Sequence, residues 1–139
     1  MAKLAVSPLV LKDVLLTIGT GAPDDFARHV SSVVLEPSTS SVTWHGLSPD
    51  ASFSDQTAPV WTCKLSFAQD WTSANSLSKY LLANSGKTMP AVFKPNASAT
   101  TQVTVSCSLI LTPGAIGGEV NKVMEATVTL GVSGVPTVV

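Results

Sequence analysis

The stretch Thr101–Thr112, TQVTVSCSLILT, decides how the rest of this chain is interpreted. Its apolar and polar side chains alternate strictly, and β-branched residues are frequent. This pattern is typical of a half-buried β-strand. Pro113-Gly114 ends the alternation, and Gly117-Gly118 extends the loop that follows. The apolar face of this predicted strand consists of Val103, Val105, Cys107, Leu109 and Leu111.

The same alternation returns on the far side of that loop, over Lys122–Val132. Two alternating segments joined by a loop predict a long antiparallel hairpin. Val60–Gln69 is a third strand of this kind, with Trp61, Cys63, Leu65 and Phe67 facing inward. We expect shorter strands at residues 4–10, 14–20, 27–36, 41–46 and 90–95.

One segment departs from the period of two and predicts a helix near residues 73–85. Its apolar residues have helical spacing, and Thr72 or Ser73 could cap its first turn. Asn84 to Gly86 is the predicted stop at its end. We expect this helix to dock on a sheet through Leu77, Tyr80 and Leu81, with Trp71 fixing the turn between strand and helix.

The composition points to a single domain whose surface is covered by neighbours. A chain of 139 residues can bury a core without metal or disulfide support. Only 12% of its residues are charged, about half the usual ~25%. Its 18 Ser and 15 Thr carry the polarity instead, and the mean hydropathy is +0.35. A small adhesin-like or secreted β domain is the alternative that fits the same composition.

Several classes of function find no support in the sequence. The net charge is −1 and there is no run of Lys or Arg, so non-specific nucleic-acid binding is not expected. Lys12 and Asp13 interrupt the first apolar stretch, which therefore predicts neither a signal peptide nor a membrane span. We expect the product to stay in a cytoplasm. Cys63 and Cys107 then fit as reduced core thiols, with a disulfide left open.

No catalytic, metal or cofactor site is predicted, and we expect a protein that is not an enzyme. His29 and His45 stand alone, without the spacing of a zinc motif. The many serines come without a G-x-S-x-G turn. Gly19–Pro23 looks like a phosphate loop only superficially, because no G-K-[ST] follows it.

The segment Gly46–Pro59, GLSPDASFSDQTAP, is predicted as a long acidic loop. Phe53 lies within it without apolar neighbours in the sequence. Loops of this length in a small domain are usually functional or disordered.

The order of these features resembles the major tail proteins, or tail tube proteins, of long-tailed bacteriophages such as siphoviruses. Three stretches carry the resemblance: Trp61–Trp71 (WTCKLSFAQDW), Ser76–Leu82 (SLSKYLL) and Gly118–Pro136 (GEVNKVMEATVTLGVSGVP). It covers roughly residues 40–139 and rests on a pattern rather than an invariant motif.

The resemblance implies a mostly β fold, a β-sandwich or partial barrel with one flanking helix, in a single domain over 1–139. Extended arms are implied at about 1–12 and 131–139. Six copies would close a ring, and stacked rings would form the tail tube of a virion that assembles in the bacterial host cytoplasm. The loop at 46–59, with Asp50, Phe53, Asp55 and Gln56, would join successive rings. Tape-measure, tail terminator and baseplate-type proteins are the implied partners, with no membrane involved.

A tube of this kind implies a lumen through which DNA passes without specific binding. Such a surface should be neutral or acidic, because basic side chains would hold the phosphates. Glu125, Thr127 and Thr129, on the polar face of the last long strand, are the candidates to line it. Lys64 and Lys122 argue against a wholly acidic lining.

A second hypothesis is a binding module, either a capsid-decorating protein or a surface-binding β-sandwich. This would require an exposed aromatic platform. Trp44, His45 and Phe53 are the residues that could form it.

Overall fold

Within residues 2–21 and 23–139, the part of the chain that the computed structural model describes, there are eight strands and one helix. In chain order they are β1 (Leu15–Ile18), β2 (Val30–Ser38), β3 (Ser41–His45), β4 (Ser52–Gln56), β5 (Val60–Ala68), α1 (Leu77–Ala83), β6 (Thr88–Lys94), β7 (Val105–Ile110) and β8 (Glu125–Val138). The prediction of a mostly β chain with one flanking helix is confirmed.

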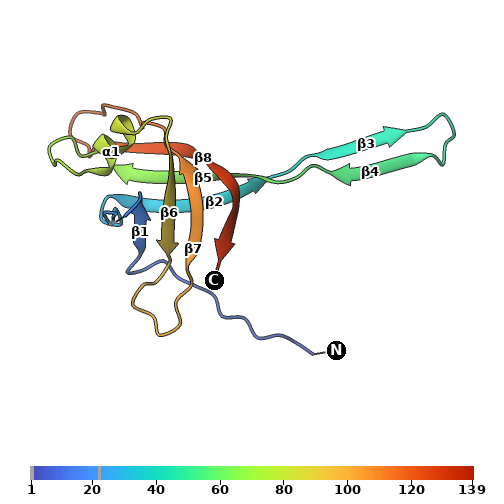
Figure 1. The fold of residues 1–139 in the computed structure, drawn as a ribbon, viewed down its shortest axis with the longest axis horizontal. Helices are drawn as coiled ribbons and strands as arrows, with labels where there is room; N and C mark the ends of the chain where they lie inside the picture. Colours follow the sequence, from blue (N-terminus) through green and yellow to red (C-terminus); the bar gives the residue numbers. More distant parts are fainter. Residues whose placement is uncertain (1, 22) are drawn as a thin grey trace.

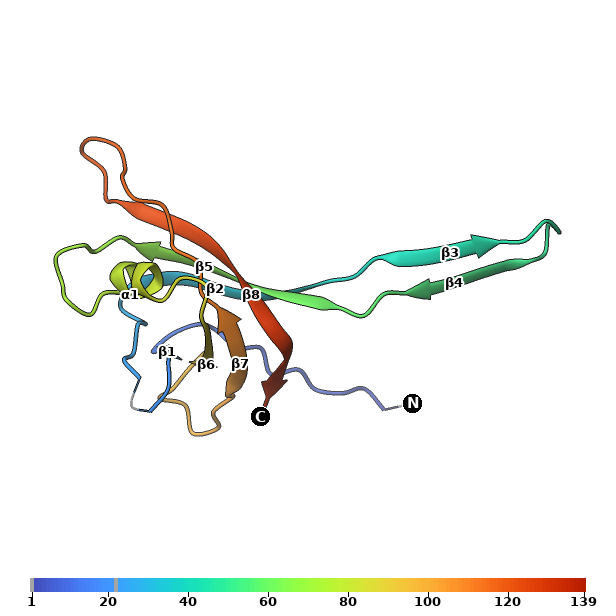
Figure 2. The same cartoon turned by 45° about the horizontal axis from the view of Figure 1, so that its top comes forward.

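Six strands form one antiparallel sheet in the order β1-β6-β7-β8-β5-β2. The sheet curves into a half-barrel: β2 and β5 run across the molecule, and β1, β6 and β7 run steeply to them (Figures 1 and 2). The helix α1 lies at one end of this body. At the other end β3 and β4 leave it as a separate two-stranded ribbon.

The long last strand, β8, joins the two halves of the sheet by changing its partner at Gly131. Residues 125–131 pair with β5, and residues 131–138 pair with β7. β7 and β8 pair antiparallel, as the predicted hairpin requires, but β7 meets residues 131–138 rather than the predicted strand at 122–132. A bend fits at Gly131, which lacks a side chain and packs against Ile110. Residues 131–138, expected as a C-terminal arm, lie within this strand.

The core lies on the concave face of the half-barrel, beneath α1. Leu65 and Leu130 are fully buried there, as alternation along β5 and β8 requires. The remaining buried apolar residues of this cluster are Leu16, Ile18, Phe26, Cys63, Phe67, Leu77, Leu81, Ala91, Leu109, Leu111, Ala126 and Val128. Burying one such Leu or Phe side chain contributes about 1.5–3 kcal/mol.

The helix is shorter than predicted, and its cap is a different residue. Ser76 caps α1, its hydroxyl accepting from the amide of Lys79. Thr72 and Ser73 do not start the helix, because their amides donate to the carboxylate of Asp70 and close a turn there. The predicted stop is confirmed: Asn84 is the C-cap, and Gly86 has a φ of +82°.

The loop predicted at 46–59 is wrong over its middle part, residues 52–56. Residues 52–56 form β4 and pair with β3, which leaves a turn at 46–51. Sequence periodicity missed this strand because the ribbon is exposed on both faces and is rich in Ser. The strand predicted at 4–10 is also absent: residues 4–10 are extended but pair with no strand among the described residues.

Candidate assembly surfaces

The ribbon β3–β4, with its connecting turn, forms an arm over residues 41–56 that projects from the body (Figure 1). Every residue of both strands is exposed. Trp44 lies directly opposite Phe53, and Val42 lies opposite Asp55. Because opposite residues in an antiparallel pair share a face, Val42, Trp44, Phe53 and Asp55 form one face of the arm. We call these four residues the apolar arm face.

The other face of the arm is polar and contains Gln56 and His45. Thr43 and Ser54 bring their hydroxyls within 3.5 Å of each other there. The four loop residues expected to act together are therefore divided. Phe53 and Asp55 share the apolar arm face, Gln56 lies on the opposite face, and Asp50 lies in the turn.

The tip of the arm is a tight turn that leaves Leu47 fully exposed. The amide of Gly46 donates to the carbonyl of Ala51 at 2.6 Å, and the amide of Ala51 donates to the carbonyl of Ser48 at 3.0 Å. The Ser48 hydroxyl donates to the Asp50 carboxylate. This hydrogen bond is the main reason why the pKa of Asp50 is lowered. The tip thus presents an apolar side chain beside a carboxylate.

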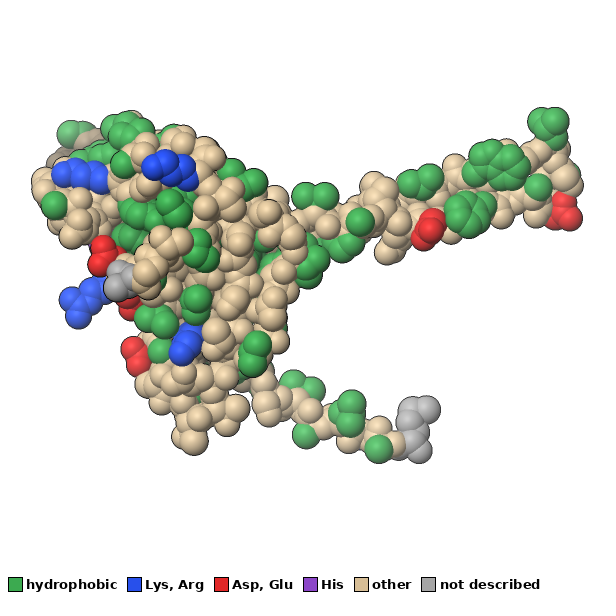
Figure 3. All heavy atoms as spheres, in the orientation of Figure 1, with side chains coloured by type: hydrophobic (Ala, Val, Ile, Leu, Met, Phe, Trp, Pro, Cys, Tyr) green, Lys and Arg blue, Asp and Glu red, His purple; other side chains and the backbone are tan. Residues whose placement is uncertain are grey.

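The arm is an element that needs a neighbour. A two-stranded ribbon is at best marginally stable in water on its own. Here the two aromatic side chains that lie opposite each other, Trp44 and Phe53, stay 62% and 58% exposed. Figure 3 shows the apolar side chains spaced along the arm and two acidic groups, without a basic one. This is the kind of surface that a partner protein covers.

The polar face of β8 extends across the neighbouring strand. Glu125, Thr127 and Thr129 are exposed and alternate with buried residues. Thr129 is paired with Lys64 of β5, and Thr127 is paired with Ser66, whose hydroxyl lies 3.1 Å from the Thr127 hydroxyl. The three predicted residues therefore belong to one hydroxyl-rich face, together with one lysine.

Leu77 and Leu81 place the apolar side of α1 fully inside the core. Tyr80 is half-buried, and its ring packs on Phe26 with centroids 5.3 Å apart. Burial, with a smaller effect from Asp24, raises the pKa of Tyr80. The burial of Phe26 could not be predicted, because this residue lies outside the periodic segments of the sequence.

Trp71, the residue expected to fix the turn between strand and helix, donates its indole N–H to Gln69 Oε1 at 3.1 Å. Gln69 also accepts from the amide of Gly117, and its amide nitrogen donates to the carbonyls of Gly117 and Glu125. Gln69 therefore ties the end of β5 to the loop before β8. Sequence analysis missed this residue, because its partners lie far away in the chain.

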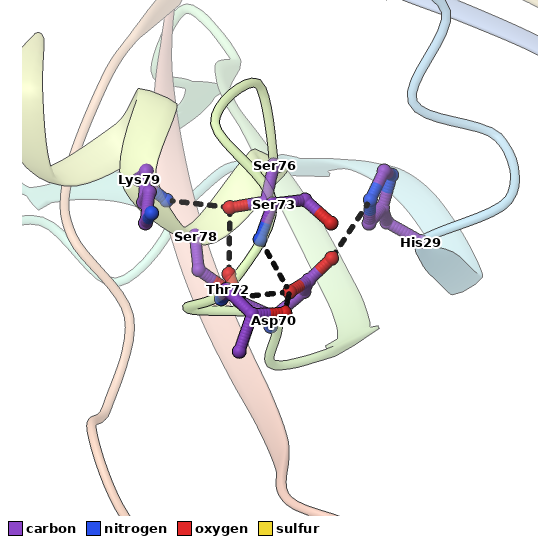
Figure 4. Close-up of polar contacts among 7 residues, drawn as sticks. All are labelled: His29, Asp70, Thr72, Ser73, Ser76, Ser78 and Lys79. Carbon is purple, nitrogen blue, oxygen red and sulfur yellow. Dashed lines mark hydrogen bonds and ion pairs between the residues drawn. The ribbon is translucent and has the colours of Figure 1, made fainter.

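A second polar cluster shapes the turn between β5 and α1 (Figure 4). Asp70 Oδ1 accepts from the Thr72 amide and hydroxyl at 3.0 Å and from the Ser73 amide at 3.1 Å. Hydrogen bonds from Ser73, followed in size by those from Thr72, hold the pKa of Asp70 well below its usual range. Asp70 Oδ2 lies 4.0 Å from His29 Nε2. These contacts account for the turn, and Ser76 adds a bond from its hydroxyl to the carbonyl of Asp70 at 2.6 Å.

The two cysteines are free thiols. Burial raises the pKa of Cys63 to about 12, and it also raises the pKa of Cys107. Both are therefore protonated at neutral pH, as expected for small core residues.

Across residues 2–21 and 23–139, no group of three or more His, Cys, Asp or Glu could hold a metal ion. The one helix of this part of the chain lacks the length and apolarity to cross a membrane.

Two solved structures share this fold. A chain from the tail of an empty GTA particle with C6 symmetry superposes with a TM-score of 0.58 at 10% identity, over 90% of this chain and 94% of that one. A chain from the sixfold-symmetrised baseplate of the anti-feeding prophage gives a TM-score of 0.57 at 14% identity, over 100% and 97%. At such identities the likeness establishes the fold alone. No protein-family model and no curated protein matches the sequence.

Proposed function

We propose that this chain is a tail-tube protein, a structural subunit that assembles with itself into rings of six copies that stack into a tube. The observation that carries the proposal is the arm at 41–56, with its exposed apolar face. The likeness in fold to chains from assemblies with sixfold symmetry supports the proposed ring. The low charge of the chain fits surfaces that are buried between subunits.

The arm is the proposed contact between successive rings. Its apolar face would pack on the body of a subunit in the next ring, burying Trp44 and Phe53. Asp50 and Asp55 would lie at the edge of that contact, where carboxylates stay hydrated. Because the arm and the surface that it meets are different parts of the chain, the contact is heterologous and can repeat along a tube.

The hydroxyl-rich face with Glu125, Thr127 and Thr129 is the proposed lining of the lumen. Threonine and serine hydroxyls hydrate the wall without attracting phosphates. Lys64 lies in register with Thr129, and one lysine among hydroxyls offers little affinity for DNA. DNA would therefore pass without specific binding.

In this role the chain would be a single domain over 1–139, located in the tail of a virion after assembly in the host cytoplasm. A siphovirus-type major tail protein is the form that the sequence resemblance suggests. The partners would be the tape-measure protein inside the tube and the terminator and baseplate-type proteins at its ends.

Replacing residues 41–56 by an Asn-Gly turn tests the proposal. The change leaves Ser40 and Thr57, whose backbone and side-chain bonds close the ribbon at its root. Asn-Gly suits a tight hairpin turn, so β2 and β5 should still pair. We expect a folded protein by circular dichroism that forms no tubes in electron micrographs. Tubes that form as readily as with the full chain would contradict the role of the arm.

The binding-module hypothesis has weaker support, because its three residues do not form one platform. Trp44 and Phe53 share a face, but His45 points to the other side of the ribbon. The same arm variant separates the two functions. A surface-binding module would lose its ligand while its oligomeric state stayed unchanged.

A further inference from the structure

The arm joins the body through a short root that belongs to neither pair of strands. β2 and β5 pair as far as Ser38 and Val60, and β3 and β4 begin at Ser41 and Gln56. The same two chain segments therefore continue from the body into the arm, but the ladder of hydrogen bonds between them is interrupted. Figures 1 and 2 show the arm leaving the body at this interruption.

The two sides of the root differ in length by one residue. Residues 39–40 lie on one side, and residues 57–59 lie on the other. An extra residue of this kind makes a β-bulge, which disrupts the ladder locally and bends the strand that contains it. Pro59 has no amide to donate, so it cannot restore a ladder bond here. The root is therefore the place where the direction of the arm can change.

The side chain of Thr57 bridges the two sides of the root. Its hydroxyl accepts from the Ser40 amide at 3.0 Å and donates to the Ser40 carbonyl at 3.2 Å. The Thr57 amide donates to the same carbonyl at 2.8 Å. In a regular ladder the Ser40 amide would donate to a backbone carbonyl, and here a side-chain oxygen replaces that acceptor. We call Ser40 and Thr57 the root clasp.

The rest of the arm gives its direction little support. Every residue of β3 and β4 is exposed, and within the described residues these strands pair only with each other. A two-stranded ribbon without packing is marginally stable on its own. The direction of the arm relative to the body is therefore set by the few hydrogen bonds at its root, as it is at a hinge.

We propose that the root is a hinge and that the root clasp locks it, so that the arm of a free subunit already points in one direction. The role of this lock in assembly rests on the proposed function, whereas the lock itself does not. An element that is held in one direction beforehand loses less conformational freedom when it is bound, which strengthens the contact. Without the Thr57 hydroxyl, the Ser40 amide loses its partner and the arm is free to swing.

Distances between two spin labels on the unassembled full-length chain test the inference. One label is attached at His45→Cys on the arm and the other at Ala68→Cys at the far end of β5, and both positions are exposed. The wild-type chain, treated with the same label, gives the background from the two native thiols. We expect one narrow distribution of distances. Thr57→Val, which keeps the shape of the side chain and removes the hydroxyl, should make this distribution at least twice as wide.

Two further variants of the labelled chain serve as controls. Thr57→Ser keeps the hydroxyl and should keep the distribution narrow. Thr43→Val makes the same chemical change on the arm but outside the root, and it should also leave the distribution narrow. A distribution that Thr57→Val does not widen, or one that is already wide in the labelled chain with an intact root clasp, would overturn the inference.

Assembly is measured separately on chains without labels. Thr57→Val should raise the protein concentration needed for tube formation at least threefold, and Thr43→Val should leave it unchanged. A wider distribution without this rise would overturn the role of the lock in assembly. A wild-type chain that never assembles would overturn the proposed function, and the distances in the free subunit would still decide whether the hinge is locked.

Discussion

Gly114 lies closer to the core than its place in a loop suggests. A Cβ at this position would come within 2.8 Å of the Phe67 ring and 3.4 Å of the Ala126 side chain. Both neighbours are buried, so neither has room to move away. The Pro-Gly pair was predicted as a turn, but its close packing could not be foreseen, because Phe67 is distant in the sequence.

We therefore expect Gly114→Ala to lower the free energy of unfolding by about 1–3 kcal/mol, the usual cost of overpacking a core. Urea denaturation of the purified protein measures the change. Ala115→Ser, at the exposed next residue, is the matched control and should be neutral. An unchanged midpoint for Gly114→Ala would mean that the loop does not pack on Phe67.

Asp70 makes the stability of the fold depend on pH, because its carboxylate accepts the hydrogen bonds that form the turn between β5 and α1. Its pKa in the folded protein is below the value of about 3.9 that an unfolded Asp has, since the Ser73 and Thr72 donors favour the carboxylate. A lowered pKa stabilises the fold above the unfolded pKa, and this contribution is lost as the pH falls through the folded value.

We expect Asp70→Asn to lower the melting temperature at pH 7. The difference in melting temperature between variant and wild type should shrink as the pH falls below about 4. Thermal unfolding between pH 2 and pH 7 checks this. Asp55→Asn, on the arm and away from the turn, is the control. A difference in melting temperature that stays constant over this range would show that the charge on Asp70 does not stabilise the fold.

At the scale of elements, alternation located the strands that have one buried face. β5 and the first half of β8 bury alternate side chains, and β7 buries Leu109, so their sequences carry the signal. β4 has no buried face, and its sequence therefore reads as a loop. The start of α1 was misplaced because the carboxylate of Asp70 captures the amides of Thr72 and Ser73 before the helix begins.

Leu77 and Leu81 lie on the apolar side of α1 and are fully buried, and this side of the helix gives a test at the scale of the element. Leu81→Ala should lower the free energy of unfolding by about 2–5 kcal/mol, because it opens a cavity in a packed core. Leu82→Ala, at the half-exposed next position, should cost far less. Chemical denaturation measures both, and equal costs would mean that α1 does not dock as described.

The arm is the element whose test concerns assembly rather than folding. Trp44→Ser with Phe53→Ser removes the apolar side chains and keeps the ribbon in place. We expect body stability to be unchanged and tube formation to fall at least tenfold, since buried aromatics dominate contacts of this kind. Thr43→Ala with Ser54→Ala, on the polar face, is the matched control. Sedimentation of the assembled protein measures the effect.

At the scale of the whole molecule, a half-barrel carries two extensions, the arm and the N-terminal segment, and within residues 2–21 and 23–139 neither pairs with a strand of the half-barrel. The alternation of apolar and polar residues predicted the class of fold. It did not predict the bend of β8 at Gly131, where this strand changes its partner from β5 to β7. Such features come from pairing between distant strands.

Electron microscopy of the concentrated full-length protein shows whether the chain assembles as proposed. We expect rings with sixfold symmetry in end views and stacked tubes in side views, and the variant that lacks residues 41–56 should form no tubes. A protein that stays monomeric at high concentration under all salt conditions, or that forms rings of another symmetry, would contradict the proposal.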